Sequence, residues 1–232
     1  MEKKLYDNEL GTITLKKASR YRRYTLKIIN GEILATMPEY GDEKKMMSFI
    51  TESKAKLKLL LKKHPPVALL DEKSQIQTAT FVMQIIRSEQ KNFKPVLKDG
   101  VLSIFCPAQT RFDDSKVQSL LREILLNVCR HEAKRVLPIR LEQLAKEYNF
   151  TYSGIKINNS KTHWGSCTGR KSINLSLSLM RLPWHLIDYV LLHELCHTVE
   201  MNHSERFWAL MDKVTHSKAK ELRKELKQHS IN

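Results

Sequence analysis

The feature that most constrains this chain is the string His-Glu-Leu-Cys-His at residues 193–197, followed by a third histidine, His203. On an α-helix, residues four positions apart lie on one face, about one turn apart. The rings of His193 and His197 would then meet at one Zn²⁺ ion, at nitrogen–metal distances of about 2.0–2.1 Å. Glu194 would stand beside the ion as a general base, which is the logic of a His-Glu-x-x-His metallopeptidase. The string therefore predicts a helix, one bound zinc ion and hydrolysis of peptide bonds.

The residues around this string have the pattern of an amphipathic helix, and no proline or glycine interrupts residues 184–200. The chain must then bend to return His203 to the metal, and Asn202 suits that bend because asparagine tolerates left-handed backbone. Ser204 is expected to cap a further helix. Three carboxylates are rival candidates for the third ligand: Glu200, Glu221 and Glu225.

Residues 162–167, Thr-His-Trp-Gly-Ser-Cys, are a second chemically informative segment. Gly165 permits a tight bend or a close backbone approach. An edge strand beside the metal helix would bind extended peptide by main-chain pairing, so Trp164, Gly165 and Ser166 are candidate substrate-binding residues. Periodicity alone favours a packed strand with a buried tryptophan and cysteine. A third interpretation makes the histidine or the cysteine of this segment a metal ligand.

Two residues of the predicted helix are candidates for stabilising the oxyanion of the transition state. Tyr189 lies one turn before His193, and it is also a candidate substrate-binding residue; the other candidate is His185. A packing or surface role is the commoner explanation for both. Asp188 and Asp212 are candidates for hydrogen-bonding the metal-binding imidazoles.

Composition indicates a globular protein and limits its partners. The chain has 232 residues, of which 41% are hydrophobic and 28% charged, and it contains no apolar stretch long enough to span a membrane. The start carries no apolar signal segment, and the four widely spaced cysteines are expected to be reduced, so a cytoplasmic location is predicted. The net charge of +15 makes nucleic acid a candidate partner. Solvated helix surface is the commoner explanation for basic runs of this kind.

Hydrophobic patterning predicts an α+β fold with two parts. Residues 1–110 are expected to form an antiparallel, β-rich region with a helix near 41–63. Residues 111–232 are expected to form a helical metal-binding domain with a small sheet. Strands are expected within residues 12–37, 75–106, 152–158 and 172–177.

Turn and breaker residues set the expected ends of these elements. Asn30 and Asp99 each precede a glycine, which is a strong hairpin signal. His-Pro-Pro at 64–66 is expected to stop the first helix. A long helix is predicted over about 115–136, and Pro138 is expected to separate it from another helix at about 139–148.

Several segments between Cys129 and Val214 together carry a family resemblance. They are His131-Glu132-Ala133-Lys134, Leu137-Pro138 with Arg140, Trp164-Gly165-Ser166-Cys167, Ile173-Asn174-Leu175, Ile187-Asp188-Tyr189-Val190, His193-Glu194-Leu195-Cys196-His197, and Asn202-His203-Ser204 with Phe207-Trp208. With them this stretch resembles the YgjP-like family of zinc metallopeptidases, relatives of the SprT-like and WLM proteases. The basic residues 19–23 resemble the family's start more weakly.

The resemblance implies a compact zincin-like (minigluzincin) fold for residues 111–232. It implies His193, His197 and His203 as zinc ligands and Glu194 as the catalytic carboxylate, with a protein or peptide as substrate. His163 stands where an arginine is usual in the family. If that arginine helps to bind substrate, the substrate preference of the family is not expected to carry over to this chain.

Two other classes of function remain open from the sequence. The SprT-like relatives act on protein crosslinked to DNA, so the basic chain could be a protease of DNA-bound protein or a nucleic-acid-associated module with structural zinc. A non-catalytic scaffold that binds a partner is the second class.

Overall fold

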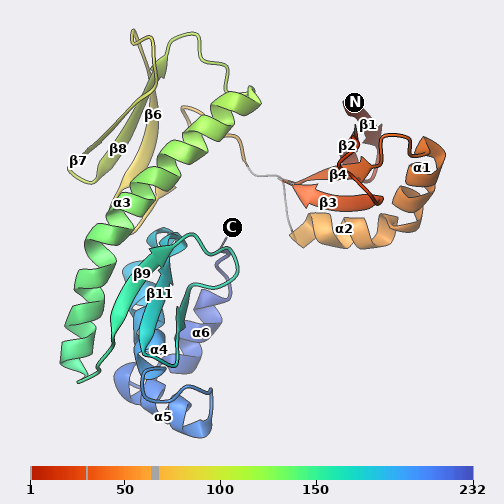
Figure 1. Cartoon of the computed structure of the whole chain (residues 1–232). Helices are drawn as coiled ribbons and strands as arrows, with labels where there is room; N and C mark the ends of the chain where they lie inside the picture. The colour runs from red at the N-terminus through yellow and green to blue at the C-terminus, as the bar shows by residue number, and fades with distance from the viewer. Residues whose placement is uncertain (1, 30, 64–67, 232) are drawn as a thin grey trace. The chain divides into compact units, whose positions relative to one another are not determined.

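The computed structural model describes residues 2–29, 31–63 and 68–231. It divides into two compact units, Met1–Leu69 and Leu70–Asn232, and each has its own hydrophobic core. Figure 1 shows the course of the chain through both units. The α+β class is confirmed, because sheets come first along the chain and helices dominate its second half. The hairpin residue Asn30 and the helix stop at 64–66 lie outside the described residues.

The first unit is a four-stranded sheet with two helices. β1 (Glu2–Asp7), β2 (Gly11–Lys17), β3 (Thr25–Ile29) and β4 (Glu32–Met37) lie in the order β1-β2-β4-β3. The sheet is mixed rather than purely antiparallel. From β2 the chain passes to β3, on the far side of β4, and then returns through β4, so β2 and β4 are parallel. Two helices, α1 (Glu43–Glu52) and α2 (Lys54–Lys63), replace the single helix expected near 41–63.

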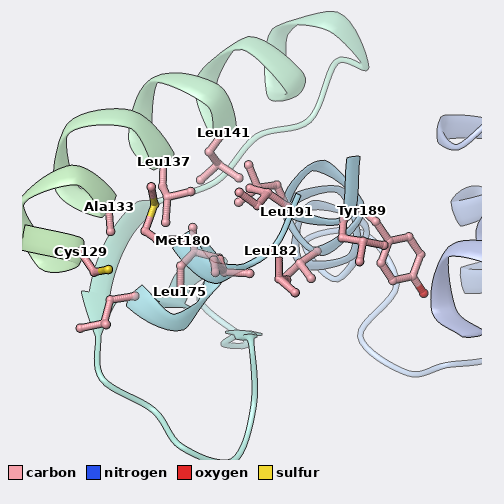
Figure 2. Close-up of a cluster of buried hydrophobic side chains, with 14 of the residues drawn as sticks. Cys129, Ala133, Leu137, Leu141, Leu175, Met180, Leu182, Tyr189 and Leu191 are labelled. Atoms are coloured by element: carbon pink, nitrogen blue, oxygen red, sulfur yellow. The ribbon is translucent and has the colours of Figure 1, made fainter. Parts of the chain in front are cut away.

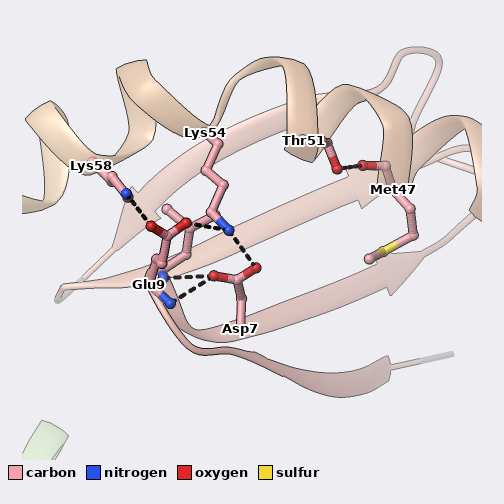
Figure 3. Close-up of polar contacts among 7 residues, drawn as sticks. Asp7, Glu9, Met47, Thr51, Lys54 and Lys58 are labelled. Atoms are coloured by element: carbon pink, nitrogen blue, oxygen red, sulfur yellow. Dashed lines mark hydrogen bonds and ion pairs between the residues drawn. The ribbon is translucent and has the colours of Figure 1, made fainter.

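Lysines of α2 in this unit are paired with carboxylates. Lys54 Nζ lies 3.2 Å from Asp7 Oδ2 and 2.5 Å from Glu9 Oε2, and Lys58 Nζ lies 2.5 Å from Glu9 Oε1 (Figure 3). These contacts tie the end of β1 and the turn after it to α2. Part of the basic run at 54–63 is therefore neutralised within the unit, as expected for an ordinary helix surface.

The second unit begins with another four-stranded sheet. β5 (Ile76–Gln77), β6 (Val82–Ser88), β7 (Lys94–Lys98) and β8 (Val101–Pro107) lie in the order β5-β6-β8-β7. Asp99 and Gly100 both have left-handed backbone, with φ of 50° and 75°, and they join β7 to β8 as the expected hairpin turn.

This sheet belongs with the helices that follow it, so the units divide at residues 69/70 and not at the expected 110/111. The buried side chain of Gln118 accepts a hydrogen bond from Leu70 N at 2.9 Å and donates one to Leu70 O at 2.8 Å. Ala79 N donates to Met180 O at 2.7 Å. Apolar residues of β6 and β8 also share one core with the later helices. No change in composition accompanies these contacts, so the sequence gives no signal for them.

The long helix α3 (Ser115–Glu147) continues through Pro138, so the expected break there is wrong. Proline removes one backbone donor and crowds the preceding turn. Leu137 and Leu141, on either side of it, are fully buried, and Figure 2 shows both directed toward the core that contains Met180. Burial of this face keeps the helix on one course despite the local cost.

A small sheet and three helices complete the second unit. β9 (Gly154–Asn158), β10 (Gly165–Cys167) and β11 (Ser172–Ser176) lie in the order β10-β11-β9. The short 3-10 helix η1 (Leu177–Arg181) leads to α4 (Trp184–Cys196), α5 (Glu205–Val214) and α6 (Ala219–Leu226). β10 is an edge strand, and it lies against α4, which carries the first histidine of the predicted metal site.

Candidate functional site

The three predicted metal-binding histidines converge at the end of α4. His193 lies in its last turn, His197 is its C-terminal cap, and His203 follows in the loop before α5. Nε2 of His193 lies 3.1 Å from Nε2 of His197 and 3.0 Å from Nε2 of His203. Among the described residues these three form one group whose ligand atoms all lie within 4.8 Å of one another.

The turn that returns His203 is built from main-chain hydrogen bonds. Thr198 N donates to Leu195 O at 2.9 Å, and Glu200 N donates to Cys196 O at 2.9 Å, which ends the helix before residue 200. The expectation of left-handed backbone at Asn202 is wrong, because its φ is not positive. The helix closes on its own carbonyls instead, so no left-handed residue is needed there.

The orientation of His197 comes from a backbone carbonyl. Its Nδ1 lies 3.0 Å from the carbonyl oxygen of Glu200. A carbonyl can only accept, so Nδ1 carries the proton and the lone pair of Nε2 points into the cluster. Asp188, one of the two carboxylates expected to hydrogen-bond the imidazoles, pairs with Arg140 instead, at 2.7 Å for both oxygens. A contact of Asp212 with an imidazole stays a prediction.

Phe207 forms an apolar floor behind the three imidazoles. Its ring stacks on that of His197, with centroids 4.5 Å apart, and meets the rings of His193 and His203 edge-on at 4.9 and 4.8 Å. It is fully buried on α5, which Ser204 caps as expected by accepting from Phe207 N. The aromatic floor restricts the rotation of all three rings.

Glu194 faces β10 rather than solvent. Its side chain is so close to Gly165 that a Cβ atom built on that glycine would lie 2.7 Å from Glu194 Oε1 and 2.8 Å from its Cγ. The expected close approach at Gly165 is therefore found, and the neighbour is the proposed catalytic carboxylate. Oε2 of Glu194 is buried without a hydrogen-bond partner among the described residues, as is Nδ1 of His193.

Burial shifts the acid–base properties of the cluster toward neutral forms. It raises the pKa of Glu194 to about 8, because the charged carboxylate loses hydration. Burial, with repulsion from His197 and His203, lowers the pKa of His193 to about 3. The pKa of His203 is lowered for the same kinds of reason, burial first. The imidazoles of His193 and His203 are therefore neutral at pH 7, which is the form that binds metal.

A hollow of about 510 Å³ opens beside this cluster. His193, Glu194 and Tyr189 of α4 line it together with Trp164 and Gly165. Tyr189 is buried, with its ring centroid 6.2 Å from that of His193, and Figure 2 shows its ring directed away from α3.

Ser166 does not line the hollow. Its hydroxyl instead lies 3.4 Å from Nδ2 of Asn174 on the neighbouring strand.

The rival ligands from the sequence are not in the histidine cluster. Glu225 pairs with His185 at 2.7 Å, and Glu200 contributes its carbonyl. Cys167 Sγ lies 3.5 Å from the carbonyl of Thr168, and all four cysteines are free. The donor set among the described residues is therefore three imidazoles.

This donor set fits a metal ion. Tetrahedral coordination with bonds of about 2.0–2.1 Å places ligand nitrogens about 3.3 Å apart, close to the separations of 3.0 and 3.1 Å. The unpartnered Glu194 oxygen is the kind of buried acceptor that a reactive site retains.

A family model described as "YgjP-like, metallopeptidase domain" matches residues 22–229. The chain belongs to the YgjP-like family. As a member of a metallopeptidase family it is a metal-dependent hydrolase, and its substrates are proteins or peptides. The YgjP-like match extends across both compact units, from β3 in the first to the residues after α6 in the second.

Other comparisons add little to the family assignment. The crystal structure of the metallopeptidase zymogen of Pyrococcus abyssi abylysin is similar at 22% sequence identity, with a TM-score of 0.37, over 40% of this chain and 93% of that one. No curated protein matches the chain. None of these comparisons indicates a nucleic-acid partner, and no helix among the described residues is long and apolar enough to cross a bilayer.

Several functional features escaped sequence reasoning. The Glu200 carbonyl could not be found, because any residue type supplies one. Phe207 and Trp208 follow the capping residue Ser204 at helical positions, but nothing in their spacing distinguishes a floor for imidazoles from an ordinary core. Arg223, which also lines the hollow, lies in a basic run typical of solvated helices.

Proposed function

We propose that this protein is a zinc-dependent peptidase in which His193, His197 and His203 hold one Zn²⁺ ion and Glu194 is the general base. The observation that supports this most strongly is the convergence of three Nε2 atoms, at 3.0 and 3.1 Å, next to a buried carboxylate. A closed structural zinc site has four protein ligands, whereas three are available among the described residues. The open donor set favours catalysis over a purely structural role.

A zinc ion held by three imidazoles would keep one position for water and lower the pKa of that water toward about 7. Glu194 would accept a proton at Oε2, the carboxylate oxygen that has no other partner. As a positioned base it would then pass this proton on to the leaving amine. Phe207 and the Glu200 carbonyl keep the imidazoles oriented throughout.

Tyr189 is the proposed oxyanion donor. It lines the hollow beside His193 and Glu194, and burial raises its pKa, so the phenol stays protonated and can donate. Trp164 and the main chain of β10 would hold extended substrate, since β10 is an edge strand. The proposal includes a cytoplasmic location, which four free cysteines support.

The decisive test compares Glu194→Gln with wild type in two measurements. Elemental analysis should find about one zinc per chain in both proteins, because Glu194 is not a ligand. Cleavage of an unfolded protein should be abolished by a chelator in wild type and reduced about 10²–10⁴-fold in the variant, since that is what a positioned base contributes. Glu221→Gln, on the surface of α6, is the control that should cleave normally. If Glu194→Gln cleaves as fast as wild type, the assigned role is wrong.

A further inference from the structure

The hollow beside the histidine cluster has a charge that the catalytic proposal does not use. Lys161, Arg223 and Lys227 line it, and Glu194 is the one acidic side chain among the described residues of its lining. None of these three cations forms an ion pair with a carboxylate of the described residues. Glu225, a close acidic neighbour on α6, is taken by His185. The hollow therefore offers positive charge next to the reacting groups.

Arg223 is fixed by an aromatic ring and not by an acid. Its Cζ lies 4.9 Å from the centroid of the Trp208 ring, and Trp208 stacks in turn on His203 at 5.9 Å. A guanidinium stacked on a ring keeps its in-plane N–H groups available for another acceptor. Arg223 also lies near the reactive side chains, since it lines the same hollow as His193 and Glu194.

We propose that this hollow binds a carboxylate of the substrate beside the scissile bond, with Arg223 as the main donor and Lys227 and Lys161 in support. The inference rests on the proposed peptidase function and specifies its substrate preference. A carboxylate can come from an Asp or Glu side chain or from the C-terminus of the peptide. A planar guanidinium suits both sources, because it donates two parallel hydrogen bonds to one carboxylate.

Charge alone cannot serve as the test, because a chain of net charge +15 attracts any acidic peptide. The control must therefore remove the same charge from the same helix. Lys224 is exposed on α6 and does not line the hollow. Comparing Arg223→Gln with Lys224→Gln separates a specific site from general attraction.

The experiment measures peptide binding to the full-length, zinc-loaded Glu194→Gln protein, so that nothing is cleaved. Three labelled peptides of one sequence are compared by fluorescence polarisation: central Glu with an amidated end, central Gln with an amidated end, and central Gln with a free terminal carboxylate. We expect one or both carboxylate peptides to bind about tenfold tighter than the neutral peptide. Arg223→Gln should reduce that ratio to about two, and Lys224→Gln should leave it near ten.

The three peptides also identify the source of the carboxylate. A preference for central Glu assigns a side-chain subsite, and a preference for the free end assigns recognition of the chain terminus. Equal binding of all three peptides, or a preference that Arg223→Gln retains, would overturn the inference. Failure of the peptidase proposal looks different: wild type would then cleave nothing, whereas the binding ratios would still report on the hollow.

Discussion

Gly165 is the residue of the edge strand β10 that lies next to Glu194, the proposed general base. The hydrogen atom at this position leaves room for the Glu194 side chain, whose Cγ, Cδ and Oε1 atoms lie 2.7–2.9 Å from where a Cβ would stand. The contact is a steric one between a strand and a helix, so it fixes the direction of the carboxylate without a hydrogen bond. Gly165 is accordingly a positioning residue as well as part of the wall of the hollow.

Gly165→Ala should therefore lower activity without removing the metal. A methyl group would lie 2.7 Å from Glu194 Oε1 and must displace it, and a misplacement of about 1 Å costs on the order of a hundredfold in rate. The measurements are kcat on a peptide substrate and zinc content. Gly169→Ala is the matched control, because a Cβ there meets nothing within 4 Å. Equal rates for the two variants would contradict the steric account.

Glu194 also makes the metal-free protein less stable at high pH. Its pKa of about 8 in the folded protein lies above its ordinary value of 4.5. Between these values the folded chain keeps a proton that the unfolded chain has released, so the free energy of unfolding falls as the pH rises. The burial of a carboxylate thus has a measurable cost.

Glu194→Gln should remove that cost, because glutamine has no proton to titrate. In chelator at pH 8 the variant should be more stable than wild type by on the order of 4 kcal/mol, and the difference should vanish near pH 4.5. Urea unfolding of both proteins across this range measures it. The lowered pKa of His193 affects both proteins alike and cancels. A difference that does not change with pH would refute the assignment of the raised pKa to Glu194.

Among the elements, α3 and α4 are joined by an ion pair of Arg140 and Asp188. Both carboxylate oxygens accept from the guanidinium at 2.7 Å, and both side chains are partly buried. Asp188 lies five residues before His193, so this pair holds the helix that carries His193. Paired, planar geometry of this kind is stronger than an exposed single contact.

Asp188→Asn should destabilise the protein by about 1–3 kcal/mol, because a partly buried guanidinium loses its charged partner. The control is Glu142→Gln, which breaks the exposed pair of Glu142 and Lys146 on α3. That change should cost about 0.5 kcal/mol or less. Thermal unfolding of both variants gives the comparison. Equal losses of stability would show that the Arg140–Asp188 pair contributes no more than an exposed ion pair.

The histidine cluster was predictable because its signals are local. The His-Glu-x-x-His spacing and the cap at Ser204 each act within a few residues. The glycine at 165 indicated a close approach, but its neighbour, Glu194, lies far away in the sequence. Pro138 misled because the cost of a proline inside a helix is local, whereas the burial of Leu137 and Leu141 that offsets it is tertiary. The hydrogen bonds of Gln118 to Leu70 span 48 residues, and periodicity carries no information on them.

At the scale of the whole molecule, the chain has two hydrophobic cores. Ile33 is fully buried in the core of the first unit, and every residue of the histidine cluster belongs to the second. The cores share no residue, so the two units need not unfold together.

Ile33→Ala should lower the stability of the first unit by about 2–5 kcal/mol and leave zinc affinity unchanged. Ile29→Ala, at a side chain of the same sheet that is 48% exposed, is the control and should have little effect. Denaturant unfolding followed together with a zinc-release assay tests both statements. A matching fall in zinc affinity would show that the units are energetically coupled.

The cluster described above draws all its donor nitrogens from one short stretch, with His203 only ten positions after His193. Closing so short a loop costs little chain entropy. Capture of an ion there would consequently be a local event in the polypeptide, independent of the distant strands. A cation bound there would hold residues 193–203 in their folded arrangement while the C-terminal part of the chain folds.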